Sequence, residues 1–472
     1  MRTLHLTNSW HETSGGVATF YRALMDEANR REQLIRLVVP GERDGVEECG
    51  KFARIYHLRA PRSPLNPAYR TIYPKQFLSA RGKLQEILRV ESPDLVEICD
   101  KYTLNYLGAL LRRRLLPGVR LRPVVVGLSC ERMDDNFRTY LGKLPFRSTF
   151  CSLYMRWLYF PFFDHHIANS EYTADELRSA AQGLVARRTW IRHMGVDLVH
   201  LSAHRRSRAM RARLLENFGA TEDSTLLLYV GRLAPEKNLG LLFDLLAQLS
   251  RAGSRDCRLL MVGDGIERER WERDSARRAP GRALFLGHIK DRNVLADLYA
   301  NADFFIHPNP REPFGIALLE AMASGLPLIA PNCGGVTAYA SAENAWLAEA
   351  TLEDFSAAIH EAWSNPTLRD RKVAAAAETV RRYEWNRVAA SFLDLYAALI
   401  GSAQGSMEAF PAPAFMSTPL SGTQWLLTRT VSAAVERSFN LLSNLSLARE
   451  GSAHATCSPS YRQGNGSERL SD

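Results

Sequence analysis

The stretch "LLLYVGRLAPEKNLGLLFDLLAQLSRA", residues 226–252, decides the fold of this chain. It opens with a β-rich apolar run that ends at a glycine. From about residue 238, apolar side chains recur at i, i+3 and i+4. A buried strand followed by an amphipathic helix is the repeating unit of a parallel sheet that is covered by helices. We therefore expect a series of βαβ units to begin here.

A first series of the same kind precedes this stretch. Upstream, strands are predicted at 3–7, 34–39, 54–58, 94–99, 123–129 and 164–170, with helices at about 17–30, 75–90 and 104–116. Thr173 and Glu176 stand at capping-box spacing, which predicts that a further helix opens there. Downstream, strands are predicted within 226–233, 258–265, 283–288, 303–309 and 327–331. Two such series indicate an α/β protein with two doubly wound, Rossmann-like domains.

The domain boundaries follow from these two series of strands and helices. We assign residues 1–200 to an N-terminal Rossmann-like domain and 201–384 to a C-terminal one, with the joint near the arginine-rich stretch 204–213. A helical pattern occupies 385–400. From residue 401 to 472 the composition shifts to Ser, Ala, Pro and Gly, which is typical of a flexible tail. Within that tail, 425–447 keeps apolar residues at helical spacing, so this segment lies on a membrane, docks on a partner or packs on the body.

Composition bounds the class of protein. The 472 residues are 46% hydrophobic and 24% charged, as in soluble globular proteins, and the net charge is +9. Such a charge favours anionic partners, although an arginine-rich codon usage explains it equally well. The seven cysteines are scattered without a Cys-x-x-Cys pair, which favours a reducing compartment and argues against structural zinc. The N-terminal apolar run is too short for a signal peptide, and glycine, proline and serine break the uncharged stretch 321–342. We expect a cytoplasmic enzyme with no metal site.

Two loops at predicted strand ends suit anion binding. "SGGVATF" places Gly15 and Gly16 between the first strand and the first helix, where backbone N–H groups can approach a phosphate. A tight strand-to-helix turn explains the same pair. In "GRLAPEKN" (231–238), Arg232 and Lys237 can neutralise a diphosphate, or they are solvated surface charges. The turn "VGDGIERE" (262–269) is interpreted as structural.

A third stretch, "NPREPFGIALLEAMASGLPL" (309–328), sets two glutamates around an apolar segment. Pro313 favours an extended backbone at Glu312, so a helix begins after it, near Gly315, and runs to about Ser324. Glu320 then lies about a turn and a half inside that helix. Both carboxylates can accept hydrogen bonds from one ligand, and a sugar hydroxyl and a ribose are suitable donors.

These motifs together resemble the retaining glycosyltransferases of family 4. The resemblance rests on "EPFGIALLE", "GRLAPEKN" and the early "SGG", supported by "NSEYTADEL" (169–177) and "GVD" (195–197), and it covers about residues 2–400. It implies the GT-B fold, in which two Rossmann-like domains face each other across a cleft, followed here by a C-terminal extension. It also implies that the last helix, opened by "YEW" (383–385), crosses back to the N-terminal domain.

The resemblance implies a role for each matching position. Arg232 and Lys237 would hold the donor diphosphate, with Gly16 closing over it, and Glu312 would bind the transferred sugar. The catalytic set is then Arg232, Lys237 and Glu312. The substrate-binding set comprises Gly15, Gly16, Cys130, Glu131, His288, Ile289, Phe314, Gly315, Ile316 and Glu320, with Glu320 on the ribose and His288 and Ile289 flanking the base.

Within the family, three segments look similar to bacterial GDP-mannose-dependent α-mannosyltransferases of the phosphatidylinositol mannoside type. They are "YRTIYPKQF", "PDLVEICDKYTLNYLG" and "SCERMDDNF". Such relatives usually carry Ser-His-Glu-Arg where this chain has Cys130 in place of the histidine. A thiol cannot act as a cationic donor. Either the activity is altered, or His165, His166 or Glu131 compensates.

The hypothesis is sugar transfer from a nucleoside diphosphate sugar to a hydroxyl of a lipid or saccharide acceptor. Since no residue is placed as a covalent nucleophile, front-face substitution with retention is favoured, without any cofactor besides the donor. Residues 137–163 interleave aromatic and basic side chains, which suits peripheral contact with an anionic membrane at its inner face; a helix pair packed on the sheet is the alternative. The rival functions are a nucleotide-sugar epimerase or sugar phosphorylase and a catalytically impaired binding protein. No nucleic-acid motif is present.

Overall fold

The computed structural model describes residues 1–11, 15–63, 69–141, 147–181, 188–251 and 256–405. By compactness the chain divides into one unit of residues 1–61 and 69–410 and a second of 62–68 and 411–472. Both sheets described below belong to the first unit. The helix predicted at 425–447 lies outside the described residues.

The first sheet has eight strands in the order β3-β4-β2-β1-β5-β6-β7-β8. Every neighbouring pair is parallel except β3 and β4, which are antiparallel. We call this sheet with its helices the first lobe. Its strands are β1 (Arg2–Thr7), β2 (Leu34–Gly41), β3 (Gly45–Glu48), β4 (Ala53–Arg59), β5 (Leu95–Cys99), β6 (Val124–Ser129), β7 (His165–Ala168) and β8 (Thr189–Ile191).

Helices connect these strands, as the parallel pairing requires. They are α1 (Gly16–Arg30), α2 (Lys83–Glu91), α3 (Asn105–Arg112), α4 (Met133–Leu141), α5 (Arg147–Tyr154) and α6 (Glu171–Ala181). Short turns of other helix types occur at Pro74–Gln76, Met155–Tyr159, Phe160–Phe162 and Ala203–Arg205.

The second sheet has six parallel strands in the order β11-β10-β9-β12-β13-β14, and with its helices it forms the second lobe. The strands are β9 (Thr225–Val230), β10 (Cys257–Val262), β11 (Ala283–Gly287), β12 (Phe304–Ile306), β13 (Leu328–Pro331) and β14 (Trp346–Ala348). The helices are α7 (Arg208–Glu216), α8 (Gly240–Arg251), α9 (Arg268–Arg278), α10 (Arg292–Asn301), α11 (Ile316–Ala323), α12 (Leu352–Ser364) and α13 (Pro366–Val380). Short 3₁₀ turns occur at Pro235–Lys237, Gly334–Ala338 and Arg381–Tyr383.

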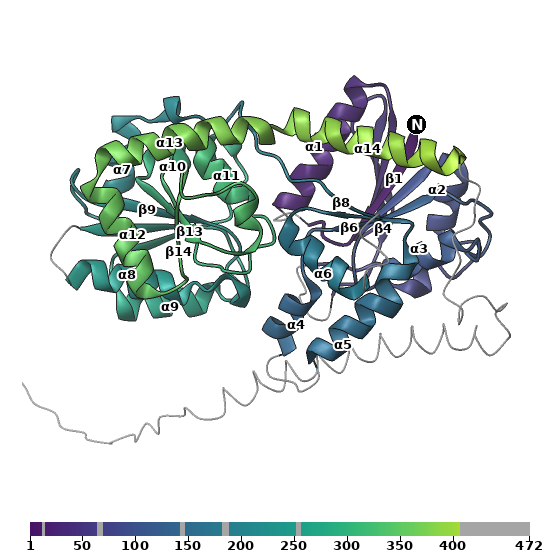
Figure 1. Cartoon of the computed structure of the whole chain (residues 1–472), viewed down its shortest axis with the longest axis horizontal. Coiled ribbons are helices and arrows are strands. Elements are labelled where there is room, and N and C mark those ends of the chain that lie inside the picture. The colour runs from purple at the N-terminus through teal and green to yellow at the C-terminus, as the bar shows by residue number, and fades with distance from the viewer. Residues whose placement is uncertain (12–14, 64–68, 142–146, 182–187, 252–255, 406–472) are drawn as a thin grey trace, which may run out of the picture. The chain divides into compact units, whose positions relative to one another are not determined.

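The apolar faces of these helices explain the layering. Helices α8, α9 and α12 cover one face of the second sheet and α7, α10, α11 and α13 the other (Figure 1). On α8, Leu242, Phe243 and Leu246 are buried against the strands, and the Phe243 ring stacks on Trp271 of α9 at 5.6 Å between ring centres. The i, i+3, i+4 pattern that predicted α8 is therefore the pattern that the core buries.

Three details differ from the sequence prediction. The helix predicted at 75–90 is instead a 3₁₀ turn at Pro74–Gln76 followed by α2, which starts after Gly82. Helix α6 begins at Glu171 and not at Thr173, because Ser170 caps it by accepting a hydrogen bond from Thr173 N (3.2 Å). Strands β3, β8 and β14 were not predicted, since each is short and β3 is also exposed along its whole length.

The last described helix, α14 (Trp385–Gly405), packs on α1 of the first lobe, with Phe392 and Phe20 at 4.8 Å between ring centres. A buried carboxylate anchors it. Glu97 of β5 accepts a hydrogen bond from Tyr396 of α14 and another from Tyr21 of α1 (3.1 Å). His5 Nδ1 lies 3.0 Å from the same carboxylate, and the His5 and Glu97 side chains are fully buried.

We predict that Glu97→Ala strongly destabilises the protein. It leaves the polar atoms of His5, Tyr21 and Tyr396 buried without their acceptor, at a cost of about 3 kcal/mol or more in the free energy of unfolding. Urea unfolding followed by tryptophan fluorescence measures it. The matched control is Glu86→Ala, which removes an exposed ion pair with Lys83. Equal effects of the two substitutions would contradict the role of the buried carboxylate.

Candidate active site

Two loops meet at the carboxyl edge of the second sheet. Strands β9 and β12 are neighbours, so the loops that follow them lie side by side. The first loop carries Arg232 and Lys237, and the second carries His307, Asn309 and Glu312. Asn238 joins the loops directly, since its Nδ2 donates to Pro308 O at 3.0 Å. Sheet order therefore brings together two motifs that are far apart in the sequence.

Glu312 is the centre of this edge. Lys237 Nζ donates to Glu312 Oε2 at 2.7 Å, Asn309 Nδ2 donates to the same oxygen at 3.2 Å, and His307 Nε2 lies 3.1 Å from it. The Lys237 and Glu312 side chains are only 13% and 11% exposed. Burial alone would raise the pKa of Glu312, but the Lys237 charge and the His307 contact hold it well below its usual range. Glu312 is thus a buried, ionised acceptor.

The N-terminus of α11 lies beside this carboxylate, and no side chain caps its backbone N–H groups. Gly315 has φ of 86°, which favours glycine. Tyr339 OH donates to Phe314 O (2.8 Å) and Gly315 O (2.7 Å). A Cβ at Gly335 would lie 1.8 Å from Pro313 O, so only glycine permits this approach. The sequence analysis missed this supporting turn, for which the Gly-Gly pair at 334–335 was an available signal.

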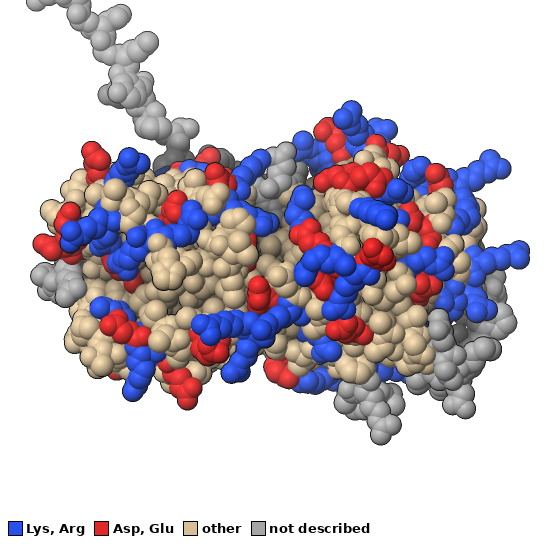
Figure 2. All heavy atoms as spheres, turned by 90° about the horizontal axis from the view of Figure 1, so that it is seen from above, with Lys and Arg blue, Asp and Glu red and all other residues tan. Residues whose placement is uncertain are grey.

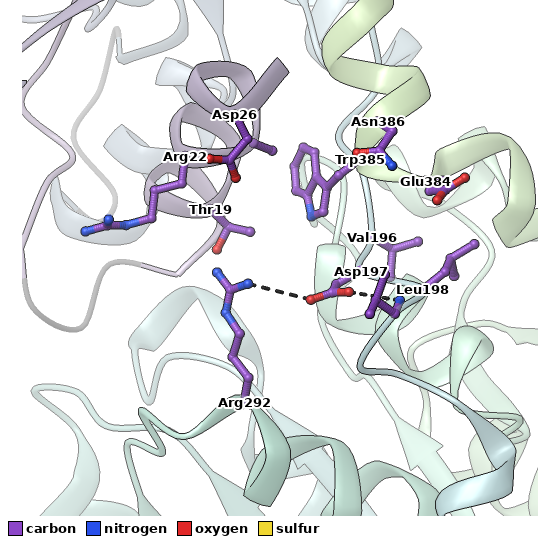
Figure 3. Close-up of a pocket in the computed structure, with 12 residues that line it drawn as sticks. Thr19, Arg22, Asp26, Val196, Asp197, Leu198, Arg292, Glu384, Trp385 and Asn386 are labelled. Carbon is purple, nitrogen blue, oxygen red and sulfur yellow. Dashed lines mark hydrogen bonds and ion pairs between the residues drawn. The ribbon is translucent and has the colours of Figure 1, made fainter. Parts of the chain in front are cut away.

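Glu320 lies further along α11 and is half-buried. Tyr299 OH donates to its Oε2 at 2.8 Å. Burial raises the pKa of Glu320, and the Asp197 carboxylate acts in the same direction, while Arg292 opposes it. Asp197 and Arg292 form an ion pair at 3.6 Å that borders a cavity of about 140 Å³, which α1 and residues 196–199 and 384–386 also line (Figure 3). Glu320 is therefore influenced by charges from outside its own helix.

Loops of the first lobe contact the segment 311–316. Ser170 Oγ donates to Pro313 O at 2.6 Å, and Arg311 Nε lies 3.5 Å from Asp135 Oδ1 on α4. A Cβ on Gly16 would lie 3.0 Å from Ile316 Cδ1, so the predicted glycine loop sits against the first residue of α11. The structure thus brings Gly16 to the same helix start as Phe314 and Gly315. Gly15 stands beside it, accepting from Thr19 N at 3.1 Å.

Arg232 is more exposed than Lys237, with 52% of its side chain accessible, and it pairs with Glu236 at 2.9 Å. Its charge also acts on the first lobe. Burial raises the pKa of Glu131, and Arg232 opposes this less strongly than Lys101 does; Arg232 also interacts with Tyr69. His11 experiences the same charge and that of His288. His11 and Tyr69 were missed by the sequence analysis; a histidine between the first strand and the glycine pair was the signal available.

Cys130 lies apart from this cation. Its thiol contacts the Cys99 thiol, and this contact together with burial raises the pKa of Cys99 well above its usual range. Of the three residues considered as compensating for it, His166 is fully buried in β7 with Nε2 3.1 Å from Phe160 O. His165 precedes it at the start of that strand. Glu131 is the one whose pKa responds to Arg232.

The remaining predicted positions occupy loops at strand ends. His288 and Ile289 follow β11, with His288 exposed and Ile289 half-buried. The turn predicted to be structural packs on the β9 loop, since a Cβ at Gly263 would lie 1.9 Å from Gly231 O. The structure therefore gathers Lys237, Glu312 and the start of α11 tightly. The ligand roles of all these residues remain predictions.

Charge and membrane features were also compared with the prediction. On the face drawn in Figure 2, lysines and arginines are interspersed with aspartates and glutamates. In the part of the chain that the structure describes, no group of three or more His, Cys, Asp or Glu side chains is arranged to hold a metal ion. Of the helices within the described ranges, none is long and apolar enough to cross a membrane.

Comparisons with known proteins bear on this geometry. Residues 14–200 match the family model "Glycosyltransferase Family 4", and residues 210–379 match "Glycosyl transferases group 1". The chain is 30% identical over 400 residues to a GDP-mannose-dependent alpha-(1-6)-phosphatidylinositol dimannoside mannosyltransferase of Mycobacterium tuberculosis, covering 83% of this chain and 95% of the relative. It is 28% identical over 415 residues to a GDP-mannose-dependent alpha-mannosyltransferase of Corynebacterium glutamicum, covering 86% and 90%.

Solved structures agree on the fold. Sucrose-phosphate synthase from Thermosynechococcus elongatus superposes with a TM-score of 0.67 at 20% identity, covering 85% of this chain and all of that one. Anabaena HepE in complex with UDP and glucose gives 0.62 at 17% identity, covering 84% and 100%. The architecture shared with these neighbours is GT-B, as predicted.

We predict that Lys237→Met destabilises the fold by about 3 kcal/mol at pH 7, because it strands a buried carboxylate. The folded-state pKa of Glu312 is depressed, so the ion pair contributes fully above the unfolded value of about 4.3 and is lost as pH falls through the folded value. In the variant, burial raises the pKa of Glu312. Protonation of Glu312 in acid then removes the unpaired buried charge. The difference from wild type should therefore shrink between pH 7 and pH 4.

Chemical denaturation at several pH values measures this difference. The double variant Lys237→Met with Glu312→Gln should recover most of the stability at pH 7, whereas Lys83→Met, which removes an exposed pair, should have little effect at any pH. A Lys237→Met penalty that does not depend on pH would contradict the ionised state of Glu312.

Proposed function

Because this chain belongs to the family 4 glycosyltransferases, we propose that it transfers mannose from GDP-mannose, with retention, to a hydroxyl of a glycolipid or polysaccharide precursor. Glycosyl transfer follows from the family. The donor and acceptor are proposed from the names of the curated relatives, which are GDP-mannose-dependent and act in one case on a phosphatidylinositol dimannoside. The observation that carries the proposal is the buried Lys237–Glu312 pair beside the open start of α11.

The donor diphosphate is assigned to the cations of this edge. Negative charge develops on the leaving phosphate as the anomeric C–O bond breaks, and preorganised positive groups stabilise such charge best. Arg232, half-exposed, and Lys237, whose ammonium has N–H groups besides the one given to Glu312, suit this role. The uncapped N–H groups at the start of α11 and the adjacent Gly16 would complete the phosphate site.

Glu312 and Glu320 are assigned to hydroxyl groups. An ionised Glu312 is an acceptor for sugar hydroxyls, and the Lys237 ammonium keeps it ionised. Glu320, one turn along α11, would accept from the ribose. His288 and Ile289, after β11, would flank the base, while Glu131 and Cys130 would face the sugar from the first lobe.

The proposed reaction breaks the bond between the anomeric carbon and the phosphate oxygen while the acceptor oxygen bonds to the same face of that carbon. The acceptor hydroxyl proton passes to the departing phosphate oxygen. Glu312 is held by Lys237, Asn309 and His307 and therefore serves as a hydrogen-bond acceptor and not as a nucleophile. The donor nucleotide sugar is the only small molecule besides the acceptor that this scheme needs.

The acceptor side of the proposal includes peripheral contact with an anionic membrane. On α5 and the turn after it, Phe150, Leu153 and Trp157 are 54%, 51% and 40% exposed, at spacings that place them on one helical face. Arg156 lies over the Trp157 ring at 5.1 Å. Exposed aromatic side chains next to arginines suit the headgroup region of an acidic bilayer.

Loss of either cation should lower the catalytic rate of the folded protein sharply, in addition to the effect that Lys237 has on stability. We expect Lys237→Ala and Arg232→Ala each to lower kcat by about a hundredfold or more for transfer from GDP-mannose to a lipid extract or a mannose-containing acceptor. Arg273→Ala, an exposed arginine of α9, is the control. Full activity of Lys237→Ala would refute the diphosphate assignment, and epimerised sugar nucleotide in acceptor-free incubations would favour an epimerase.

Membrane contact is tested by sedimentation with vesicles. The triple variant Phe150→Ser, Leu153→Ser and Trp157→Ser should lose most of its binding to phosphatidylglycerol-containing liposomes at low salt, because the apolar surface that enters the interface is removed. Val46→Ser with Val90→Ser, which also removes exposed apolar side chains, should bind as wild type does. Equal binding by all three proteins would exclude this face as the contact.

A further inference from the structure

An imidazole of the first lobe interacts electrostatically with Arg232 of the second. His11 stands four residues after β1, on the loop that leads to Gly16, and its ring is 3.8 Å from the Tyr69 ring in an edge-to-face arrangement. Helix α1 follows this loop, and its first residue, Gly16, packs against Ile316 of the second lobe. Tyr69 in turn interacts with the Arg232 guanidinium. The β1–α1 loop thus brings a histidine to the edge that carries Arg232.

The charges around His11 disfavour its cationic form. Burial, and then the positive charges of Arg232 and His288, lower the pKa of His11 to about 4, so the ring is neutral at pH 7. Tyr69 is the aromatic group against it. The carboxylates of Glu131 and Glu236 act on Tyr69. The positive charges around the ring disfavour its protonation, and a bound anion would have the opposite effect.

We propose that His11 is a ligand of the donor diphosphate and takes up one proton when the nucleotide sugar binds. This inference rests on the function proposed above. The two negative charges of a sugar diphosphate, placed against Arg232, would offset the positive field and stabilise an imidazolium at the same point. The proton comes from solvent and returns to it when the nucleoside diphosphate leaves. His11 would then donate a charge-assisted hydrogen bond to a phosphate oxygen.

The loop that follows β6, two strands away from β1 in the sheet, offers no such group. At the end of β6 the corresponding side chain is the Cys130 thiol, which is engaged with Cys99. A thiol carries no positive charge in any protonation state, whereas an imidazole can acquire one when an anion arrives. Burial and, after it, the Arg232 charge lower the pKa of His11.

Calorimetry tests the proton directly. The full chain is titrated with GDP-mannose, without acceptor, at pH 6.5 in two buffers of different ionisation enthalpy. Because the ester-linked diphosphate does not itself titrate near this pH, the slope of observed heat against buffer enthalpy reports protein protonation. We expect uptake of about one proton by the wild type and almost none by His11→Gln, with Kd raised about tenfold. The control, His204→Gln, removes an exposed histidine and should keep the wild-type slope.

A spectroscopic measurement separates this role from a purely structural one. In protein labelled with ¹³C at histidine Cε1, the resonance missing from His11→Gln should move to an imidazolium shift when GDP-mannose is added. Binding without proton uptake, or uptake that persists in His11→Gln, would overturn the inference and leave the proposed function standing. No binding of GDP-mannose at all would overturn both.

Discussion

A buried ion pair organises this molecule. The Lys237 ammonium and the Glu312 carboxylate meet at 2.7 Å with little access to solvent, and a charge in such a place is tolerated only when it is paired and hydrogen-bonded. Satisfying Glu312 therefore fixes the loop after β9, which supplies Lys237, and the loop after β12, which supplies Asn309 and His307. Gly315, three residues after Glu312, is the N-cap of α11, so the contacts of Glu312 also restrict the orientation of this helix.

Polar groups tie the first lobe to this edge and to α14. Near α11 these groups include buried Ser170, which donates to Pro313 O, and the ion pair of Arg311 with Asp135, whose side chains are 32% and 14% exposed. Far from it, Glu97 holds Tyr396 of α14 in full burial. The fully buried tie is costly to break, whereas an ion pair near solvent exchanges with water more easily. The ligand side of the lobe contact is thus the more adaptable of the two.

Local periodicity was enough to predict most of the fold, and long-range pairing explains what it missed. Strands such as β9 and helices such as α8 bury the residues that made them recognisable. The helix predicted at 75–90 was wrong because the apolar pattern continues across Gly82, where the backbone turns. Strand β3 is exposed and has Val46 as its single apolar residue, so it carries no alternating apolar pattern.

The site was predictable where one motif holds both the ligand group and its support, as in 312–320. It was not predictable where sheet order decides. Only the adjacency of β9 and β12 shows that Lys237 neutralises Glu312, and the sequence analysis had left Lys237 as either a phosphate ligand or a surface charge. His11 and Tyr69 were missed for the same reason, since the contact between their rings joins two loops that are remote in sequence.

Because residue 130 is a cysteine, positive charge for a bound anion has to come from another part of the first lobe. Cys130 and Cys99 contact each other at the ends of neighbouring strands β6 and β5, next to the buried Glu97, and this contact together with burial raises the pKa of Cys99. An imidazolium in that place would be drawn toward the Glu97 carboxylate, which His5, Tyr21 and Tyr396 already satisfy. A neutral thiol leaves that carboxylate to its structural task of holding α14. The β1–α1 loop, which Gly16 keeps against α11, is then the part of the first lobe best placed to offer a titrating cation to an anion bound at Arg232.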